Sequence, residues 1–118
     1  MPNISVIIPI YNEEGNILML FERLRAVVRE LDKSYEFFFV NDGSKDASLA
    51  IVKDLSSKFP EVRYIDFARN FGHQVAVTAG LDHCSGNVAV IIDADLQDPP
   101  ELISAMYAKW KEIGRAHV

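Results

Sequence analysis

The chain has few features that would cross-link it or anchor it in a membrane. Its 118 residues include one cysteine, Cys84, so no internal disulfide can form, and no CxxC pair or Cys/His cluster accompanies it. No apolar run approaches the roughly 20 residues that a membrane-spanning helix needs. The N-terminus has no basic segment of the kind that opens a signal peptide. These absences predict a soluble, cytoplasmic chain in which Cys84 is a buried small hydrophobe.

Clusters of positive charge and several common catalytic loops are also missing. The chain has 12 Lys and Arg against 17 Asp and Glu, a net charge of -5, and no basic block, which argues against nucleic acid as a partner. It contains neither GxGxxG after its first apolar run nor GxxxxGK[ST], and no Gly-x-Ser-x-Gly turn. These absences exclude the usual dinucleotide dehydrogenases, P-loop NTPases and α/β-hydrolases. An anionic ligand would need a metal ion or backbone N–H groups to bind.

What the chain does contain is an alternation of strand-like and helix-like patterns. Hydrophobic residues make up 49% and charged residues 25%, as in a folded domain with one core. Strands are predicted at Ile4–Ile10, Tyr35–Val40, Val62–Phe67 and Val88–Ile92. Helices are predicted from an N-cap at Asn12 to about Leu31, around Leu49–Leu55, over His73–His83, and from Pro99 and Pro100 with Leu102 and Ile103 on the apolar face. This alternation predicts an α/β fold with a parallel, doubly wound sheet.

A polar cluster follows each predicted strand. The four clusters are Tyr11–Glu14, Asn41–Ser44, Arg69–Gly72 and Asp93–Gln97. In parallel sheets of this kind, ligands bind at the carboxyl ends of the strands. One polar turn after a strand has an ordinary structural explanation, but four turns rich in Asp, Asn and Gly predict a binding site at this edge.

The last cluster has the composition of a metal site. Asp93 and Asp95 directly follow an apolar strand, and Gln97 adds a third oxygen. Carboxylate and amide oxygens suit hard cations, so the cluster predicts Mg²⁺ or Mn²⁺ bound by Asp93, Asp95 and Gln97. The alternative is a solvated turn before the last helix.

The first two clusters offer acceptors for a nucleoside. Asp42 could accept hydrogen bonds from a base or a ribose, and Gly43 would allow close backbone approach or a positive φ. The alternative is a turn that caps a helix. Tyr11 offers an aromatic surface, with Asn12 and Glu13 as acceptors, and the alternative there is N-capping with acidic side chains complementing the helix dipole.

The third cluster supplies positive charge. Arg69 could contact a phosphate, and its alternative is a surface ion pair. His73, at the start of the next helix, is a weaker candidate for a contact, because a histidine at a helix start is more often incidental.

Together these stretches resemble glycosyltransferase family 2. The matching segments are Ser5–Glu14, Val40–Ser44, Arg69–Gly72 and Asp93–Glu101, which occur in the family's order and spacing and span nearly all of residues 2–111. The Arg69–Gln74 and Asp93–Glu101 segments are most similar to the polyprenyl-phosphate branch, which includes dolichyl-phosphate mannose synthase and bactoprenol glucosyltransferase.

The resemblance implies a GT-A fold, a Rossmann-like, mostly parallel sheet flanked by helices. It implies that Pro9, Tyr11, Glu13 and Asp42 bind the nucleoside, that Asp93 lies near ribose and metal, and that Asp95 and Gln97 ligate Mg²⁺ or Mn²⁺. The implied reaction is inverting transfer of a sugar from a UDP- or GDP-sugar donor to a lipid-phosphate acceptor. In the full-length protein this would occur at the cytoplasmic face of the membrane. Neither a catalytic base nor an oligomeric state is indicated.

The resemblance also implies a truncated chain. Residues 1–111 match the N-terminal, donor-binding part of a GT-A domain, so we expect the acceptor-binding half to be missing. Residues 112–118 can be encoded by the start of a common sequencing adapter, which predicts a non-native tail. The alternative is an ordinary helix end, with Gly114 just beyond the last turn.

Two other functions compete with the glycosyltransferase hypothesis. A receiver-like signalling module also gathers acidic residues and Mg²⁺ at strand ends. It would need an acceptor Asp after its third strand, whereas Asp66 lies within that strand, and no suitable Lys follows the fourth. A catalytically dead, truncated fragment is the other alternative.

Overall fold

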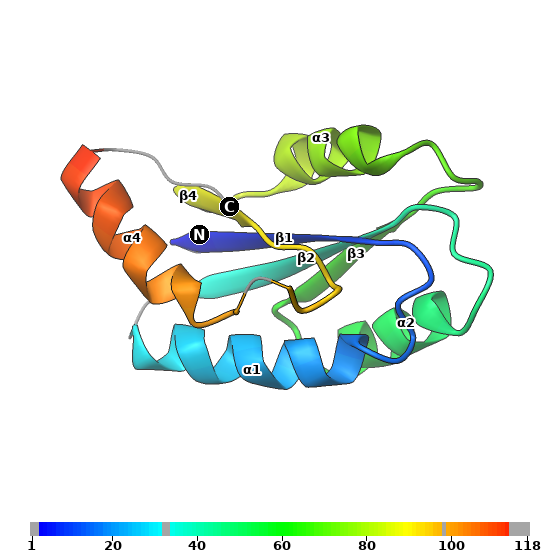
Figure 1. Ribbon diagram of the computed structural model, residues 1–118, viewed down its shortest axis with the longest axis horizontal. Helices are drawn as coiled ribbons and strands as arrows, with labels where there is room; N and C mark the ends of the chain where they lie inside the picture. The colour runs from blue at the N-terminus through cyan, green and yellow to red at the C-terminus, as the bar shows by residue number, and fades with distance from the viewer. Residues whose placement is uncertain (1–2, 32–33, 98, 114–118) are drawn as a thin grey trace.

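The computed structural model describes residues 3–31, 34–97 and 99–113, which form strands and helices in strict alternation (Figure 1). The elements are β1 (Ile4–Ile10), α1 (Ile17–Glu30), β2 (Tyr35–Asn41), α2 (Ser48–Lys58), β3 (Val62–Asp66), α3 (His73–His83), β4 (Val88–Ile91) and α4 (Leu102–Ile113). The predicted α/β class is confirmed. Residues 114–118, most of the predicted non-native tail, lie outside the described residues.

The sheet is parallel throughout, in the order β3-β2-β1-β4. β1 lies inside it, where Ile4 pairs with Tyr35 on one side and with Val88 on the other, and all seven β1 residues are buried. This burial on both faces explains the continuous apolar run that predicted the strand. In the receiver-like order, β3 would lie beside β1. Here β3 pairs with β2 at the edge, which excludes the signalling alternative.

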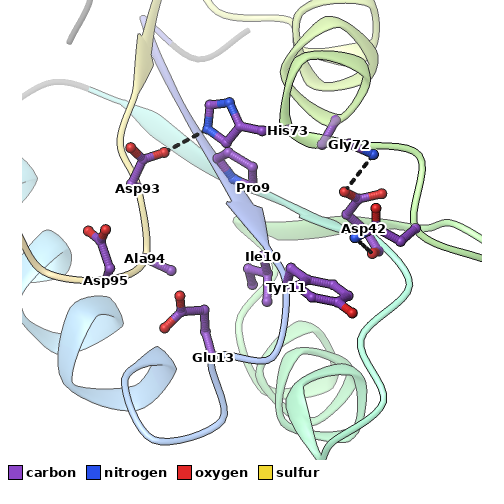
Figure 2. A pocket seen from close by; sticks show the side chains of 12 residues that line it. Pro9, Ile10, Tyr11, Glu13, Asp42, Gly72, His73, Asp93, Ala94 and Asp95 are labelled. Carbon is purple, nitrogen blue, oxygen red and sulfur yellow. Dashed lines mark hydrogen bonds and ion pairs between the residues drawn. The ribbon is translucent and has the colours of Figure 1, made fainter.

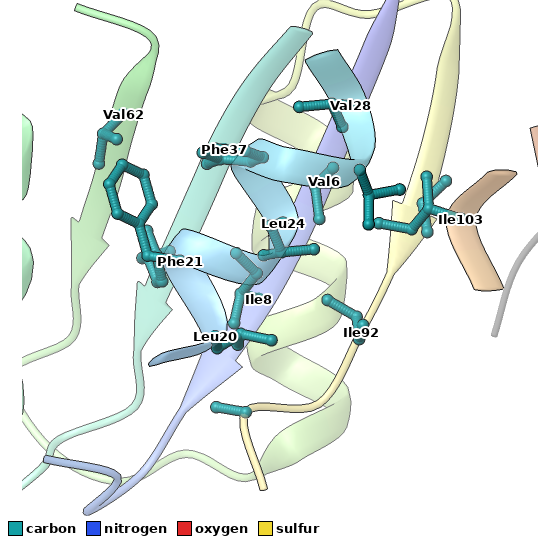
Figure 3. Packing of buried hydrophobic residues seen from close by; sticks show 14 of the residues in the cluster. Val6, Ile8, Leu20, Phe21, Leu24, Val28, Phe37, Val62, Ile92 and Ile103 are labelled. Carbon is teal, nitrogen blue, oxygen red and sulfur yellow. The ribbon is translucent and has the colours of Figure 1, made fainter. Parts of the chain in front are cut away.

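Helices cover both faces of the sheet unequally. α1 and α2 lie on one face, and α3 lies on the other (Figure 1). Alternate β1 residues point to opposite sides, so Ile8 joins the larger cluster under α1 while Ile7 joins a smaller one under α3. Figure 3 shows Leu20, Phe21 and Leu24 of α1 packed over the sheet. Each fully buried side chain of this size contributes about 1.5–3 kcal/mol, so the α1 face supplies most of the core's stabilisation.

The start of α1 differs from the prediction. Asn12 was expected to cap the helix, but it adopts a φ of 54°, and the helix begins at Ile17 after an N-cap at Asn16. The carbonyl of Glu13 instead closes a turn, accepting hydrogen bonds from the N–H groups of Asn16 (2.9 Å) and Ile17 (3.2 Å). The loop between β1 and α1 is therefore longer than predicted.

The start of α4 also differs. Pro99 and Pro100 precede the helix rather than forming its first turn, and their carbonyls accept hydrogen bonds from Leu102 and Ile103. Ile103 is buried as predicted, whereas Leu102 is 43% exposed, because the buried stripe of α4 runs through Ile103 and Tyr107. Within residues 3–31, 34–97 and 99–113, no helix is long and apolar enough to cross a membrane.

Candidate functional site

An open pocket of about 360 Å³ lies at the carboxyl ends of β1, β2 and β4 (Figure 2). It brings together six of the residues that the sequence indicated: Pro9, Tyr11, Glu13, Asp42, Asp93 and Asp95. Because β1 lies between β2 and β4, its last residues form a floor. Asp42 stands on one side of this floor, with Asp93 and Asp95 on the other (Figure 2).

Asp42 holds the loop Arg69–Gly72 in place. The residue is only 3% exposed, and its Oδ1 and Oδ2 accept hydrogen bonds from the backbone N–H groups of Phe71 (2.7 Å) and Gly72 (3.0 Å). Its backbone carbonyl accepts a third bond from the side chain of Asn70, at 3.3 Å. The sequence indicated Asp42 as a ligand contact but gave no sign of this anchoring role, which joins residues far apart along the chain.

Gly43 permits the contact between the two loops. Its φ is 71°, and a Cβ there would lie 2.3 Å from the backbone nitrogen of Asn70 and 2.4 Å from the carbonyl carbon of Arg69. The prediction of a positive φ and a close backbone approach is therefore confirmed, and the backbone that approaches is the Arg69–Asn70 peptide. Any side chain at this position would push the loop away from Asp42.

The β1–α1 and β2–α2 loops bond to each other in both directions. The N–H of Asn12 donates to Ser44 Oγ (2.9 Å), while Asn12 Oδ1 accepts from the N–H of Lys45 (2.8 Å). Likewise the N–H of Glu14 donates to Asp46, and Glu14 accepts from Ala47. Asn12, predicted to bind the nucleotide-sugar, thus lies outside the pocket lining in a structural position.

The opposite wall is held by fewer contacts. Asp93 Oδ1 lies 2.8 Å from His73 Nε2, and Asp95 Oδ1 accepts the backbone N–H of Gln97 at 3.1 Å. Between Asp95 and Gln97 the chain turns sharply at Leu96, whose φ is 63°. Gln97, the third predicted metal ligand, is exposed and does not line the pocket. The sequence makes His73 only a weak candidate, and it is the fold that brings His73 to Asp93.

Two further predicted residues line a second, adjacent pocket of about 610 Å³. Gly43 and Arg69 belong to it, together with Tyr11 and Asn70, which line both pockets. The guanidinium of Arg69 lies 4.6 Å from the centre of the Phe71 ring, a cation–π contact. The one basic residue predicted to contact a phosphate therefore stands outside the first pocket.

The first pocket is strongly acidic. Four carboxylates line it, those of Glu13, Asp42, Asp93 and Asp95, and no Lys or Arg is among its lining residues. Oxygen ligands of this kind fit Mg²⁺ or Mn²⁺, and Asp93 and Asp95 share a wall. Across the described part of the chain, no three His, Cys, Asp or Glu side chains gather closely enough to hold a metal alone. A cation here would therefore need further oxygens from water or from a bound ligand.

The family model for glycosyl transferase family 2 matches residues 5–118. The chain belongs to this family. It is 55% identical over 108 residues to the uncharacterized glycosyltransferase YkcC of Bacillus subtilis, covering 92% of this chain and 33% of that protein. It is 42% identical to the bactoprenol glucosyl transferase of Shigella phage SfV, covering 92% and 35%. The chain thus spans about a third of the length of the curated relatives it matches.

Solved structures give the same fold. The mannosyltransferase PcManGT of Pyrobaculum calidifontis, in complex with GDP-Man and Mn²⁺, matches with a TM-score of 0.77 and 26% identity over 92% of this chain and 32% of that one. S. aureus TarS in complex with UDP matches with a TM-score of 0.72 and 25% identity, covering 93% and 32%. The chain therefore has part of a GT-A fold, as the sequence predicted.

Proposed function

We propose that this chain is the donor-binding part of an inverting, metal-dependent glycosyltransferase that moves a sugar from a UDP- or GDP-sugar to a polyprenyl phosphate. The observation that carries the proposal is the charge of the first pocket, which has four carboxylates and no Lys or Arg among its lining residues. A nucleoside diphosphate is itself anionic, so a cation must separate it from these groups. The neighbouring mannosyltransferase was solved with GDP-Man and Mn²⁺ together, which supports this pairing.

The two sides of the pocket would bind different parts of the nucleotide-sugar donor. Tyr11, with its exposed ring, and Asp42 would contact the nucleoside beside Pro9 and Glu13, with Gly43 and Arg69 contributing from the adjacent pocket. Asp93 and Asp95 would hold the metal near the diphosphate, and Gln97 orders Asp95 through its backbone N–H. When bound, Mg²⁺ or Mn²⁺ would stabilise the charge that develops on the departing nucleoside diphosphate.

The acceptor is proposed from chemistry and from relatives. A relative at 42% identity is named a bactoprenol glucosyl transferase, which supports a lipid phosphate as acceptor. A phosphate monoester with a second pKa near 6 is largely ionised at neutral pH, so it can attack without a strong general base. Such a reaction would place the full-length protein at the cytoplasmic face of the membrane.

Calorimetric titration tests the proposed donor site directly. UDP and GDP are titrated into the folded chain with and without Mn²⁺, beside Asp95→Asn and the charge-matched control Asp54→Asn on α2, whose carboxylate pairs with Lys58 on the surface. We expect one nucleotide to bind only with Mn²⁺, Asp95→Asn to weaken that binding at least tenfold, and the control to leave it unchanged. Absence of binding to folded protein would refute an intact donor site.

The same titration separates binding from turnover. A chain that binds donor with metal yet transfers no sugar would still carry the proposed site, and the dead-fragment alternative would then concern catalysis alone. The nucleotide that binds more tightly also decides between UDP and GDP.

A further inference from the structure

His73 makes a contact that the proposed function does not use. It is the first residue of α3, and its Nε2 lies 2.8 Å from Oδ1 of Asp93, although the two residues belong to different walls of the pocket. An ionised carboxylate can only accept hydrogen bonds, so the Nε2–H must donate to Asp93. One lone pair of Asp93 Oδ1 is thereby used by His73 (Figure 2).

The position of His73 is itself fixed. The preceding residue, Gly72, has a φ of 105°, and its N–H donates to Asp42 Oδ2 at 3.0 Å. A continuous series of contacts therefore runs from Asp42 through Gly72 and His73 to Asp93. Both ends of this series are carboxylates of the pocket: Asp42 directly follows β2, and Asp93 lies two residues beyond the end of β4.

The contact with His73 has a consequence for any cation that Asp93 binds. Mg²⁺ and Mn²⁺ favour six-coordinate sites with single-oxygen carboxylate contacts, whereas Ca²⁺ accepts six to eight ligands and takes both oxygens of a carboxylate readily. Groups that hydrogen-bond a ligating carboxylate orient it and tune the metal site. The hydrogen bond to Oδ1 leaves that oxygen a second lone pair but fixes the orientation of the Asp93 carboxylate, so that Oδ2 is the oxygen with no protein partner among the described residues.

We propose that His73 is a positioning residue that holds the Asp93 carboxylate in an orientation favouring ligation through Oδ2 alone, and so makes the site favour a small divalent cation over Ca²⁺. This inference rests on the proposed function, because it requires that Asp93 binds a metal. It concerns the choice of metal and the orientation of a ligand, and it assigns His73 no contact with substrate.

The test compares Mn²⁺ and Ca²⁺ affinities in the presence of saturating nucleotide. Free Mn²⁺ is followed by its electron paramagnetic resonance signal, and Ca²⁺ by competition. Three variants are compared with the unaltered chain: His73→Ala, which removes the donor; His73→Gln, whose amide N–H reaches a similar position; and His83→Ala, a control at the far end of α3. His83 Nδ1 bonds the carbonyl of Ala79 in its own helix, and its ring lies 6.4 Å from that of Phe38, away from the pocket.

We expect His73→Ala to lower the ratio of Mn²⁺ to Ca²⁺ affinity about tenfold, as outer-shell changes at metal sites typically do. His73→Gln should restore most of the ratio, and His83→Ala should leave it unchanged. A His73→Ala chain with an unaltered ratio, or with both affinities reduced equally, would overturn the inference. If the unaltered chain binds no Mn²⁺ with either nucleotide, the proposed metal-dependent donor site is refuted, and the inference about His73 is refuted with it. A result in which the unaltered chain binds Mn²⁺ but His73→Ala leaves the ratio unchanged refutes the inference alone.

A second measurement needs no metal. Long-range ¹H–¹⁵N spectra report which ring nitrogen of His73 carries its proton, and the inference requires the Nε2–H form in the metal-free chain. Addition of Mg²⁺ and nucleotide should then shift the His73 signals and leave those of His83 in place. A neutral Nδ1–H ring at His73 would contradict the contact on which the inference depends.

Discussion

The two ends of the sheet use carboxylates in opposite ways. At the carboxyl ends of the strands, Asp93 and Asp95 stay accessible, and the Asp93 side chain remains 49% exposed. At the amino ends, Glu36 of β2 is only 4% exposed and accepts hydrogen bonds from Ser5 Oγ (2.5 Å), Ser85 N–H (2.7 Å) and Arg63 Nη1 (3.2 Å). A buried carboxylate that accepts hydrogen bonds from protein donors stabilises the fold, whereas an exposed carboxylate with few such bonds is available to a ligand.

Asp42 combines the two roles. It is buried like Glu36 and bonded through both oxygens, yet it lines the pocket with Asp93 and Asp95. The β2 side of the pocket is therefore built into the fold, whereas the β4 side is held mainly by His73 and a short turn. Substitutions at the two ends should separate stability from binding.

The largest loss of stability is expected from Gly43→Ala. The new Cβ would meet the backbone of Asn70 at 2.3 Å, and the residue would keep a φ of 71° that L side chains rarely adopt. We expect a loss of about 3 kcal/mol in the free energy of unfolding, measured by urea denaturation. Gly15→Ala is the control, because nothing lies within 4 Å of a Cβ there. Equal effects of the two substitutions would show that the loop contact is not tight.

Glu36→Ala should lower the free energy of unfolding by about 2 kcal/mol, because it leaves the buried hydroxyl of Ser5 and the partly buried N–H of Ser85 without their acceptor. Nucleotide affinity should stay unchanged, since Glu36 lies at the opposite end of the sheet from the pocket. Urea denaturation and calorimetry on the same variant check both halves of this statement. A tenfold fall in nucleotide affinity would show that the two ends are coupled.

Stability should also fall in acid through Glu36. Burial raises the pKa of this carboxyl group, but hydrogen bonds from Ser5, Ser85 and Arg63 outweigh burial and hold the pKa below its ordinary value of 4.5. The contribution is therefore complete above the unfolded-state pKa and is lost as pH falls through the lower folded-state pKa. In the Glu36→Gln variant, the urea concentration at the unfolding midpoint should therefore fall less steeply as the pH is lowered from about 6 to about 3. Part of the slope should survive, because hydrogen bonds also lower the pKa of Asp46 and Glu101.

The smallest change in stability is expected from Asp95→Asn, within about 0.5 kcal/mol. Asp95 is exposed, and an asparagine oxygen can still accept the N–H of Gln97. Thermal unfolding of the variant should therefore match that of the unaltered chain, even where its metal-dependent nucleotide binding is lost. A marked destabilisation would mean that this wall supports the fold as well.

The sequence predicted the fold well where local patterns decide it. Apolar runs located all four strands to within a residue, and α3 begins and ends where predicted, directly after the loop Arg69–Gly72. It failed at Asn12, whose backbone is held by Ser44 and Lys45 of another loop rather than by its own helix. The sequence also predicted that Asp42 and Asp93 lie in one pocket, because the carboxyl ends of parallel strands meet at the same edge of the sheet. It could not find the His73–Asp93 pair, since no local pattern relates residues on α3 to the end of β4.

The position of β1 has a consequence for how the chain folds. This strand leaves the ribosome before the other three strands of the sheet, but its pairing with Val88–Ile91 must wait until β4 has been made. Pairings this distant in sequence require closure of long loops before they become favourable, so folding of this sheet should be slow compared with that of a helical domain of similar size. Until then, α1, β2 and α3 can cover β1, but its edge toward β4 stays unpaired, and aggregation during synthesis competes with closure of the sheet.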